Sequence, residues 1–203
     1  MINVYNVDKP KNYNLKHKKK DFIIEYFDIF SNKQCQEIIN YILNLEKNSL
    51  LIDEDKYTSM NIKHHTFNTA DNFNHPISTF SLDNIYPKIK YCVNHYVQEY
   101  SVLKNNKFLI NCFKFKKIPE HGGFFDWHCE QSNLHNIYRT LVIQIYLNDN
   151  FINGETEFKY YDKKIVPEVG KVLIYPAAYT HTHRGNPPIG GVKYLVSTWG
   201  FMQ

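Results

Sequence analysis

The sequence predicts an α+β fold that is mainly β, in which helices near the N-terminus cover one face of an antiparallel sandwich or barrel. Two observations predict it. Two segments before residue 105 carry apolar residues at helical spacing, and short β-rich runs separated by turn residues follow residue 106. A length of 203 residues with 43% hydrophobic residues is typical of one folded domain with a sizeable core.

The N-terminal segment differs in composition from the remainder. We expect residues 1–20 to be basic and loosely ordered, and residues 21–203 to form a single domain, with helical support over 21–105 and a β core over 106–203. Residues 16–20 read Lys-His-Lys-Lys-Lys and supply much of the formal net charge of +4. A solvated terminus is the simpler interpretation, and an arm for nucleic acid or an acidic surface is the alternative. The remainder is nearly neutral, so nucleic acid is not an expected partner.

Cysteine usage and hydropathy suggest where the protein works. None of the four cysteines forms a C-x-x-C pair, and we expect a reduced, cytoplasmic protein. An apolar run of about 18 residues, as a membrane helix requires, does not occur. Residues 1–6 lack the order of a signal peptide. The oligomeric state is not readable from the sequence.

The first half contains one expected strand and two expected helices. Residues 22–27 are aromatic and β-branched, which predicts a strand. Residues 31–34, Ser-Asn-Lys-Gln, form a capping-box pattern, and the apolar spacing after them predicts a helix over 32–47. A second helix is expected over 83–100, with Pro87 in its first turn, where a missing N–H does no harm.

The second half reads as β structure. Turn residues such as Gly-Gly, Asn-Gly and Asn-Pro-Pro separate its apolar runs. The runs predict strands over 108–110, 140–147, 171–175 and 194–199.

A candidate metal site lies in this β half. His128 and Glu130 are two residues apart and would face the same side of a strand, and His183 could add a third ligand from a later strand. Two histidines and one carboxylate make the facial triad of non-haem iron(II) oxygenases. The pair alone is weak evidence, because a surface histidine near an exposed glutamate is common. His181 is an alternative third ligand, in an H-x-H arrangement.

The surrounding motifs strengthen this interpretation, because they resemble the prolyl-4-hydroxylase-like branch of the 2-oxoglutarate and iron(II) oxygenases. The resemblance covers about residues 118–201. Its pieces, in order, are Gly123 and Phe125 before His128, Tyr146-Leu147-Asn148-Asp149, Gly154-Glu155-Thr156-Glu157-Phe158, Val166-Pro167 with Gly170, Pro187 after His183, Lys193 ten residues after His183, and Trp199. The resemblance implies a double-stranded β-helix, a jelly-roll or cupin-like barrel.

The resemblance also implies cofactors and roles. Fe(II) would be held by the triad, with 2-oxoglutarate and O2 as co-substrates and ascorbate as a candidate reductant. Lys193 would bind the distal carboxylate of 2-oxoglutarate, with Thr156, Tyr146 and Trp199 also at the co-substrate site. Arg139 would face the substrate. The alternatives are an outward strand lysine for Lys193, a turn-stabilising hydroxyl for Thr156, and a strand-end arginine that reaches water for Arg139.

Three positions depart from the family pattern. Glu130 stands where the family usually has Asp, which keeps the carboxylate and argues against halogenation, since halogenating relatives have a small residue there. Ile118 and Pro119 stand where a tyrosine is favoured, so one co-substrate contact is absent or supplied elsewhere. Asn153 replaces the first Gly of a Gly-Gly pair, which affects only the turn.

The resemblance predicts a dioxygenase that hydroxylates a C–H bond and releases succinate and CO2. A peptidyl proline or another protein side chain is the first-choice substrate, a free amino acid or small metabolite the second, and a modified nucleobase the third. A catalytically silent, cupin-like binding module is the alternative from a different class. The intact triad with Lys193 argues against it, because a silent relative would be free to lose these residues.

Overall fold

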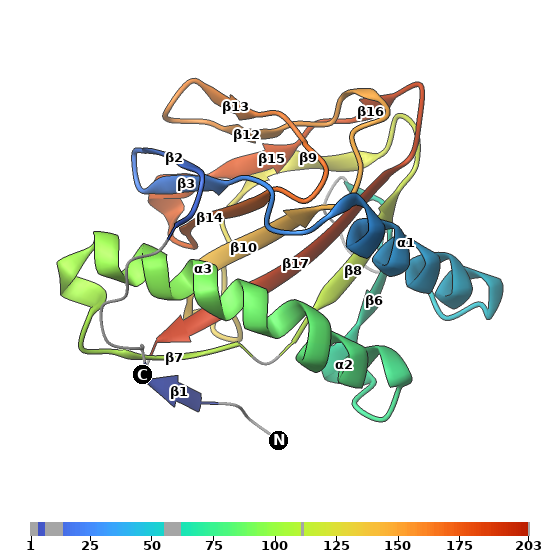
Figure 1. Cartoon of the computed structure of the whole chain (residues 1–203). Helices are drawn as coiled ribbons and strands as arrows, with labels where there is room; N and C mark the ends of the chain where they lie inside the picture. Colours follow the sequence, from blue (N-terminus) through green and yellow to red (C-terminus); the bar gives the residue numbers. More distant parts are fainter. Residues whose placement is uncertain (1–3, 7–13, 55–61, 111, 203) are drawn as a thin grey trace.

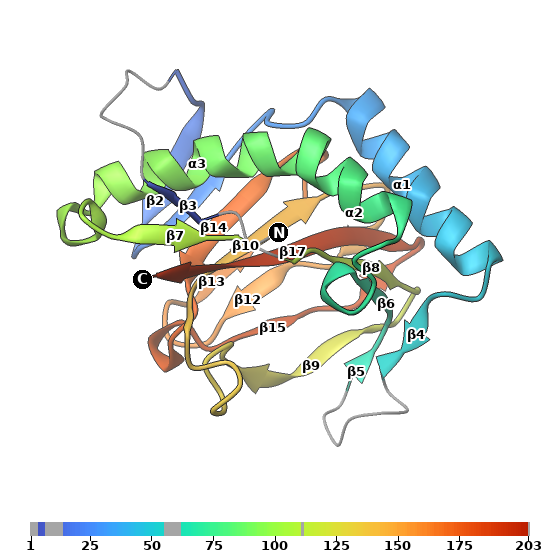
Figure 2. The same ribbon diagram turned by 90° about the horizontal axis from the view of Figure 1, so that it is seen from below.

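The computed structural model describes residues 4–6, 14–54, 62–110 and 112–202. Its elements form three layers: the longer helices, a large antiparallel sheet, and a smaller antiparallel sheet on the far side (Figure 1). Figure 2 shows the same order from below, with the helices along one side and β9 and β15 along the other. The site described below lies between the two sheets.

The large sheet has the strand order β2-β3-β14-β10-β17-β8-β6-β4, with β7 paired to β17 and β1 paired to β7. Its strands are β1 (Val4–Asn6), β2 (His17–Lys20), β3 (Ile23–Tyr26), β4 (Ile52–Asp53), β6 (His65–Asn68), β7 (Lys107–Leu109), β8 (Lys114–Ile118), β10 (Arg139–Tyr146), β14 (Val172–Pro176) and β17 (Lys193–Met202).

The smaller sheet has the order β13-β12-β15-β9-β5, and a two-stranded sheet joins β11 to β16. These strands are β5 (Ile62–Lys63), β9 (Gly123–His128), β11 (Ile152–Asn153), β12 (Thr156–Phe158), β13 (Lys163–Ile165), β15 (His183–Gly185) and β16 (Pro188–Ile189). All pairings in the described chain are antiparallel.

Helix α1 (Asn32–Lys47) has the predicted bounds. Ser31 accepts a hydrogen bond from the Gln34 backbone, and the Gln34 side chain accepts one from the Ser31 backbone, so the predicted capping box is confirmed. The buried face of the helix carries its apolar residues, and the opposite face is exposed. This face packs on the large sheet.

The second predicted helix is longer than its pattern indicated. Helix α2 (Pro76–Phe80) continues through a π-helical turn, η3 (Ser81–Ile85), into α3 (Tyr86–Glu99). Pro87 lies in the first turn of α3, as predicted. The described residues also include the short 3-10 turns η2 (Thr69–Asp71), η4 (Ser101–Leu103) and η5 (Tyr179–His181).

The N-terminal half contributes more β structure than predicted. Residues 17–20 were expected to belong to a loosely ordered segment. In the structure, His17–Lys20 instead form the edge strand β2, which pairs with Ile23–Tyr26. Exposed lysines suit such an edge, since they discourage pairing with another chain. Two further strands precede residue 106. Strand β5 pairs with β9 in the smaller sheet, and strand β6 pairs with β8 in the large sheet.

Strand β10 shows how the core places the site. Leu141, Ile143 and Ile145 belong to the cluster that packs between the large sheet and the helices. Val142 and Tyr146 alternate to the other face and join the cluster that packs toward the smaller sheet. The space between the sheets is therefore closed by apolar side chains on most sides, which leaves a sheltered cavity.

Candidate metal centre and co-substrate chamber

The three predicted metal ligands meet between the sheets. His128 ends β9, His183 begins β15, and the two are directly paired across these strands. Oε1 of Glu130 lies 3.9 Å from Nε2 of His128 and 4.0 Å from Nε2 of His183. One ligand atom from each residue lies within 4.8 Å of the other two. Metal–ligand bonds of about 2.1 Å place two ligand atoms at most about 4.2 Å apart, so these three residues fit around one ion with little movement.

Both imidazoles are held in the tautomer that a metal needs. Nδ1 of His128 lies 3.0 Å from the Asp126 carbonyl, and Nδ1 of His183 lies 2.9 Å from the His181 carbonyl. Each Nδ1–H therefore donates to backbone, which leaves the Nε2 lone pair for the ion. Tyr175 donates its hydroxyl to Nε2 of His183 at 3.0 Å, and a bound ion would replace that hydrogen bond.

The charges suit a cation as well. Burial, followed by the neighbouring His128, lowers the pKa of His183 to about 3. Burial also lowers the pKa of His128. Burial of Glu130 would raise its pKa, but the two histidines and Arg139 outweigh that and keep the pKa below its usual value. Two neutral imidazoles and one carboxylate are thus available at neutral pH, which is the donor set of a non-haem iron(II) site.

The second oxygen of Glu130 is fixed from behind. Nη1 of Arg139 donates to Oε2 at 2.6 Å, and Nε1 of Trp199 donates to the same atom at 3.0 Å. The guanidinium of Arg139 lies 3.9 Å from the Trp199 ring centroid. Both side chains therefore orient the metal ligand. Their predicted roles toward substrate and co-substrate stay predictions.

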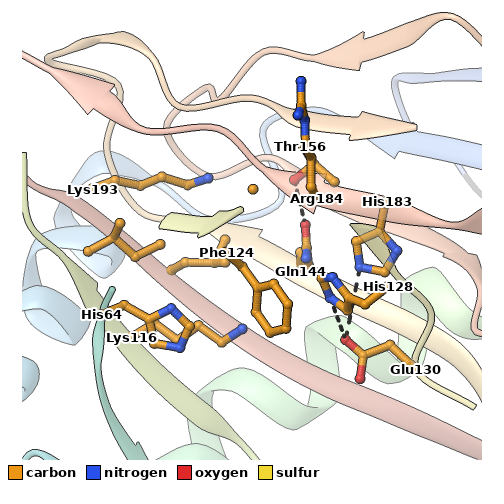
Figure 3. A pocket seen from close by; sticks show the side chains of 13 residues that line it. His64, Lys116, Phe124, His128, Glu130, Gln144, Thr156, His183, Arg184 and Lys193 are labelled. Atoms are coloured by element: carbon orange, nitrogen blue, oxygen red, sulfur yellow. Dashed lines mark hydrogen bonds and ion pairs between the residues drawn. The ribbon is translucent and has the colours of Figure 1, made fainter. Parts of the chain in front are cut away.

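Lys193 points into the cavity on the opposite side from the metal ligands (Figure 3). It is 2% exposed, and Nζ donates to the Gly154 carbonyl at 2.6 Å. Burial, followed by the charge of Lys116, lowers its pKa to about 7. No carboxylate of the described chain pairs with it, and a buried ammonium without an anion is costly. An inward lysine of this kind fits an anionic ligand, in contrast to the outward strand lysine considered from the sequence.

Two hydroxyls complete this side of the cavity. Thr156 Oγ1 donates to Gln144 Oε1 at 2.9 Å and lies 2.7 Å from the Tyr146 hydroxyl. The ammonium of Lys193 is 5.3 Å from the Tyr146 ring centroid. Ile118 lines the cavity without a polar atom, so the hydroxyls here come from other strands. The cavity of about 40 Å³ between lysine and metal ligands is the chamber that the co-substrate would fill, and we call it the inner chamber.

The turn before Thr156 explains one departure from the family pattern. Asn153 has a φ of 62° and Gly154 a φ of 73°, both in the left-handed region. Asparagine tolerates that region better than most residues, so it replaces a glycine without disturbing the turn. The turn presents the Gly154 carbonyl to Lys193.

A wider pocket of about 270 Å³ opens on the other side of the metal ligands, and we call it the outer pocket. Glu54 lies at its wall, where it accepts from Thr66 at 2.9 Å, lies 3.0 Å from Nε2 of His64, and pairs with Lys114. Burial would raise the pKa of Glu54, but His64 and Lys114 lower it well below its usual range. Burial lowers the pKa of His64 to about 4.

Four side chains that the sequence did not single out also line these cavities: His64, Lys116, Phe124 and Gln144. Phe124 stacks on the His128 ring with centroids 3.7 Å apart. Gln144 lies in β10 and Lys116 in β8, and the residues next to them are apolar or charged. Their direction toward the cavity could have been predicted only from strand alternation together with the position of the metal site.

The alternative third ligand lies elsewhere. His181 donates from Nε2 to the Asp21 carbonyl at 2.9 Å, and its Nδ1 lies 3.0 Å from Thr180 Oγ1. It is not part of the metal-ligand group of the described residues. Trp127, next to His128 in the sequence, is half-buried and lies beneath the cations of Arg184 and Lys159. Cys129 is half-buried and lines the outer pocket.

Comparison with known proteins agrees with the family resemblance seen in the sequence. Residues 110–201 match the model of the 2OG-Fe(II) oxygenase superfamily. The chain carries a 2OG-Fe(II) oxygenase domain. This matched range holds all three predicted metal ligands, Lys193 and Thr156. Fe(II), 2-oxoglutarate and O2 are the cofactors of that superfamily, so these predicted cofactors are confirmed, while ascorbate stays a prediction.

A protein of Acanthamoeba polyphaga mimivirus, provisionally named a prolyl 4-hydroxylase, is 24% identical over 210 residues, which are 96% of this chain and 76% of that protein. Two solved structures share the fold. A viral collagen prolyl hydroxylase from Paramecium bursaria Chlorella virus-1 has a TM-score of 0.61 at 16% identity, covering 89% of this chain and 96% of the other. A Trichoplax adhaerens prolyl hydroxylase, solved with a hypoxia inducible factor peptide, has a TM-score of 0.68 at 15% identity, covering 89% and 84%.

These similarities confirm the predicted double-stranded β-helix backed by helices. Among the described residues, no helix has the length and apolar character to span a membrane.

Proposed function

We propose that the chain hydroxylates a prolyl residue of a protein or peptide, with Fe(II) as the metal cofactor, 2-oxoglutarate and O2 consumed, and succinate and CO2 released. The single observation that carries the proposal is the convergence of His128, Glu130 and His183 on one side of a cavity whose other side holds the buried ammonium of Lys193. The names of the relatives favour proline over other side chains.

The residues of the site have separate tasks in that reaction. The triad would hold iron, which when bound activates dioxygen for oxidation of the C–H bond. Lys193 would pair with the distal carboxylate of 2-oxoglutarate, and Thr156 would offer it a hydroxyl. This fixes the co-substrate along the line from lysine to metal ligands. Arg139 holds Oε2 of Glu130, which leaves Oε1 facing the two histidines, where the ion would bind.

The outer pocket supports a macromolecular substrate. It lies beside the metal ligands and is wider than the inner chamber, at about 270 Å³ against about 40 Å³. An extended peptide could place one side chain there while the rest of the peptide stays outside. Free amino acids and small metabolites are the second candidates, because cationic side chains line this pocket and would suit their carboxylates.

The compartment is a further part of the proposal. All four cysteines are free, and three of them are buried. Free cysteines fit a reducing environment such as the cytoplasm.

The test is direct. Purified protein with Fe(II) and 2-oxoglutarate is incubated with proline-containing peptides, and the peptides are examined by mass spectrometry for the mass of one added oxygen atom. We expect hydroxylated peptide and an equal amount of succinate, with neither product in the Glu130→Ala variant. Oxygen addition to free amino acids alone, with no modified peptide, would replace this proposal by the small-metabolite alternative.

A further inference from the structure

Lys116 is a cation that lines both cavities and has no task in the proposed function. It lies on β8, paired with Leu195 of β17, while the next inward residue, Ile118, pairs with Lys193. Its side chain lines both the inner chamber and the outer pocket. Figure 3 shows Lys116 and Lys193 both pointing toward the metal ligands. Lys116 is thus within reach of whatever lies at the junction of the two cavities.

The neighbouring cations have partners, whereas Lys116 has none among the residues that the structure describes. Lys114 pairs with Glu54, and Arg139 pairs with Glu130. Within the described part of the chain, the ammonium of Lys116 makes neither a hydrogen bond nor an ion pair. Burial is the main cause that lowers its pKa, to about 8, with Lys114 adding to the effect. A half-buried cation with no partner is unfavourable until an anion arrives.

The co-substrate already has partners for both of its charges. On the proposed function, the distal carboxylate of 2-oxoglutarate pairs with Lys193 and its keto-acid end binds the metal. The acidic residues beside the cavity are engaged as well, since Glu54 and Glu130 each have a cation. One positive charge therefore remains at the inner edge of the outer pocket, where the substrate must approach.

We propose that Lys116 binds a carboxylate of the primary substrate and thereby selects acidic substrates. This inference rests on the proposed function. The favoured source of the carboxylate is an aspartate or glutamate side chain next to the hydroxylated residue of a peptide. The same chemistry would also serve the α-carboxylate of a free amino acid, and the experiment below separates the two sources.

The experiment uses binding as well as turnover. The probes are two matched sets of proline-containing peptides, in which one flanking position is Glu in the first set and Gln in the second. Each set is titrated into the Mn(II)-loaded protein with 2-oxoglutarate present, under anaerobic conditions, and the affinities are measured by calorimetry. Proline and prolinamide are titrated in the same way. The affinity for 2-oxoglutarate is measured separately.

We expect the parent to bind its best Glu peptide about tenfold or more tightly than the Gln partner, as for a charge-assisted hydrogen bond. Lys116→Met should remove this preference, and Lys116→Arg should keep part of it because the charge remains. Lys117→Met is the matched control. It removes a charge from the same strand, but Lys117 pairs with Glu46 rather than lining the pocket, so the preference should persist.

The outcomes distinguish the sources. A preference for proline over prolinamide that Lys116→Met abolishes, with no peptide preference, supports the carboxylate contact and assigns it to a free amino acid. Equal binding of Glu and Gln peptides and of proline and prolinamide in the parent overturns the inference. It is also overturned if Lys116→Met weakens 2-oxoglutarate binding about tenfold while leaving the Glu preference intact. Absence of hydroxylation in the parent refutes the proposed function instead, and binding still reports on Lys116.

Discussion

Replacement of Lys193 by methionine tests whether the inner chamber holds 2-oxoglutarate. Methionine keeps much of the side-chain length and removes the charge. Lys193 is 2% exposed, so the distal carboxylate would be left in a buried chamber without its cation. Removing one partner of a buried ion pair costs about 3–5 kcal/mol. That corresponds to a loss of co-substrate affinity on the order of a hundredfold or more.

The pH dependence sharpens this prediction. The pKa of Lys193 is lowered to about 7 in the free protein by burial, and a bound dianion would raise it again. A dianion binds the protonated lysine, so affinity is full below pH 7 and falls as the pH rises through and above that value. Lys193→Arg should bind with part of the parent's affinity but without this pH dependence, because arginine stays charged.

The assay is titration of 2-oxoglutarate into the Mn(II)-loaded parent and variants between pH 6 and pH 9, together with metal analysis. Metal content should be unchanged, since the triad is intact. If Lys193→Met binds 2-oxoglutarate as tightly as the parent, the lysine is only a buried strand residue. The co-substrate would then lie elsewhere.

Other predictions concern the metal centre. His183→Ala should lose iron in metal analysis while His181→Ala keeps it, and the opposite result would move the third ligand. Trp199→Phe removes one hydrogen bond to Glu130 and should weaken metal affinity about ten- to a hundredfold in competition with a chelator; unchanged affinity would mean that the hydrogen bond does not orient the ligand. Assays in chloride should give hydroxylated and no chlorinated product, because Glu130 occupies the position a halide would need; a chlorinated product would refute this.

Local sequence signals predicted the elements that are stabilised by interactions between residues close in the sequence. The capping box at Ser31 and the apolar spacing after it predicted α1 to the residue. The strands β4, β5 and β6 were missed because each has four residues or fewer and is held by pairing with strands distant in the sequence. The π-helical turn at Ser81–Ile85, through which the second helix continues from α2, was also missed, since apolar spacing does not indicate a change of helical period.

Part of the site could be predicted because some of its residues are close to one another in the sequence. His128 and Glu130 are close in sequence, and the spacing from His183 to Lys193 follows one strand connection, so a linear motif could indicate them. Lys116 comes from a strand that carries no such motif. Its inward direction depends on the register of β8 against β17, which no local pattern specifies.

The central claim is that this chain uses one iron ion and 2-oxoglutarate to place an oxygen atom from O2 into a substrate. The most direct measurement is mass spectrometry of a proline-containing peptide after reaction under isotopically labelled O2, with succinate measured in the same sample. The account predicts one labelled oxygen atom per modified peptide, matching succinate, and neither product with His183→Ala. Unlabelled oxygen in the peptide, or equal product from His183→Ala, would contradict it.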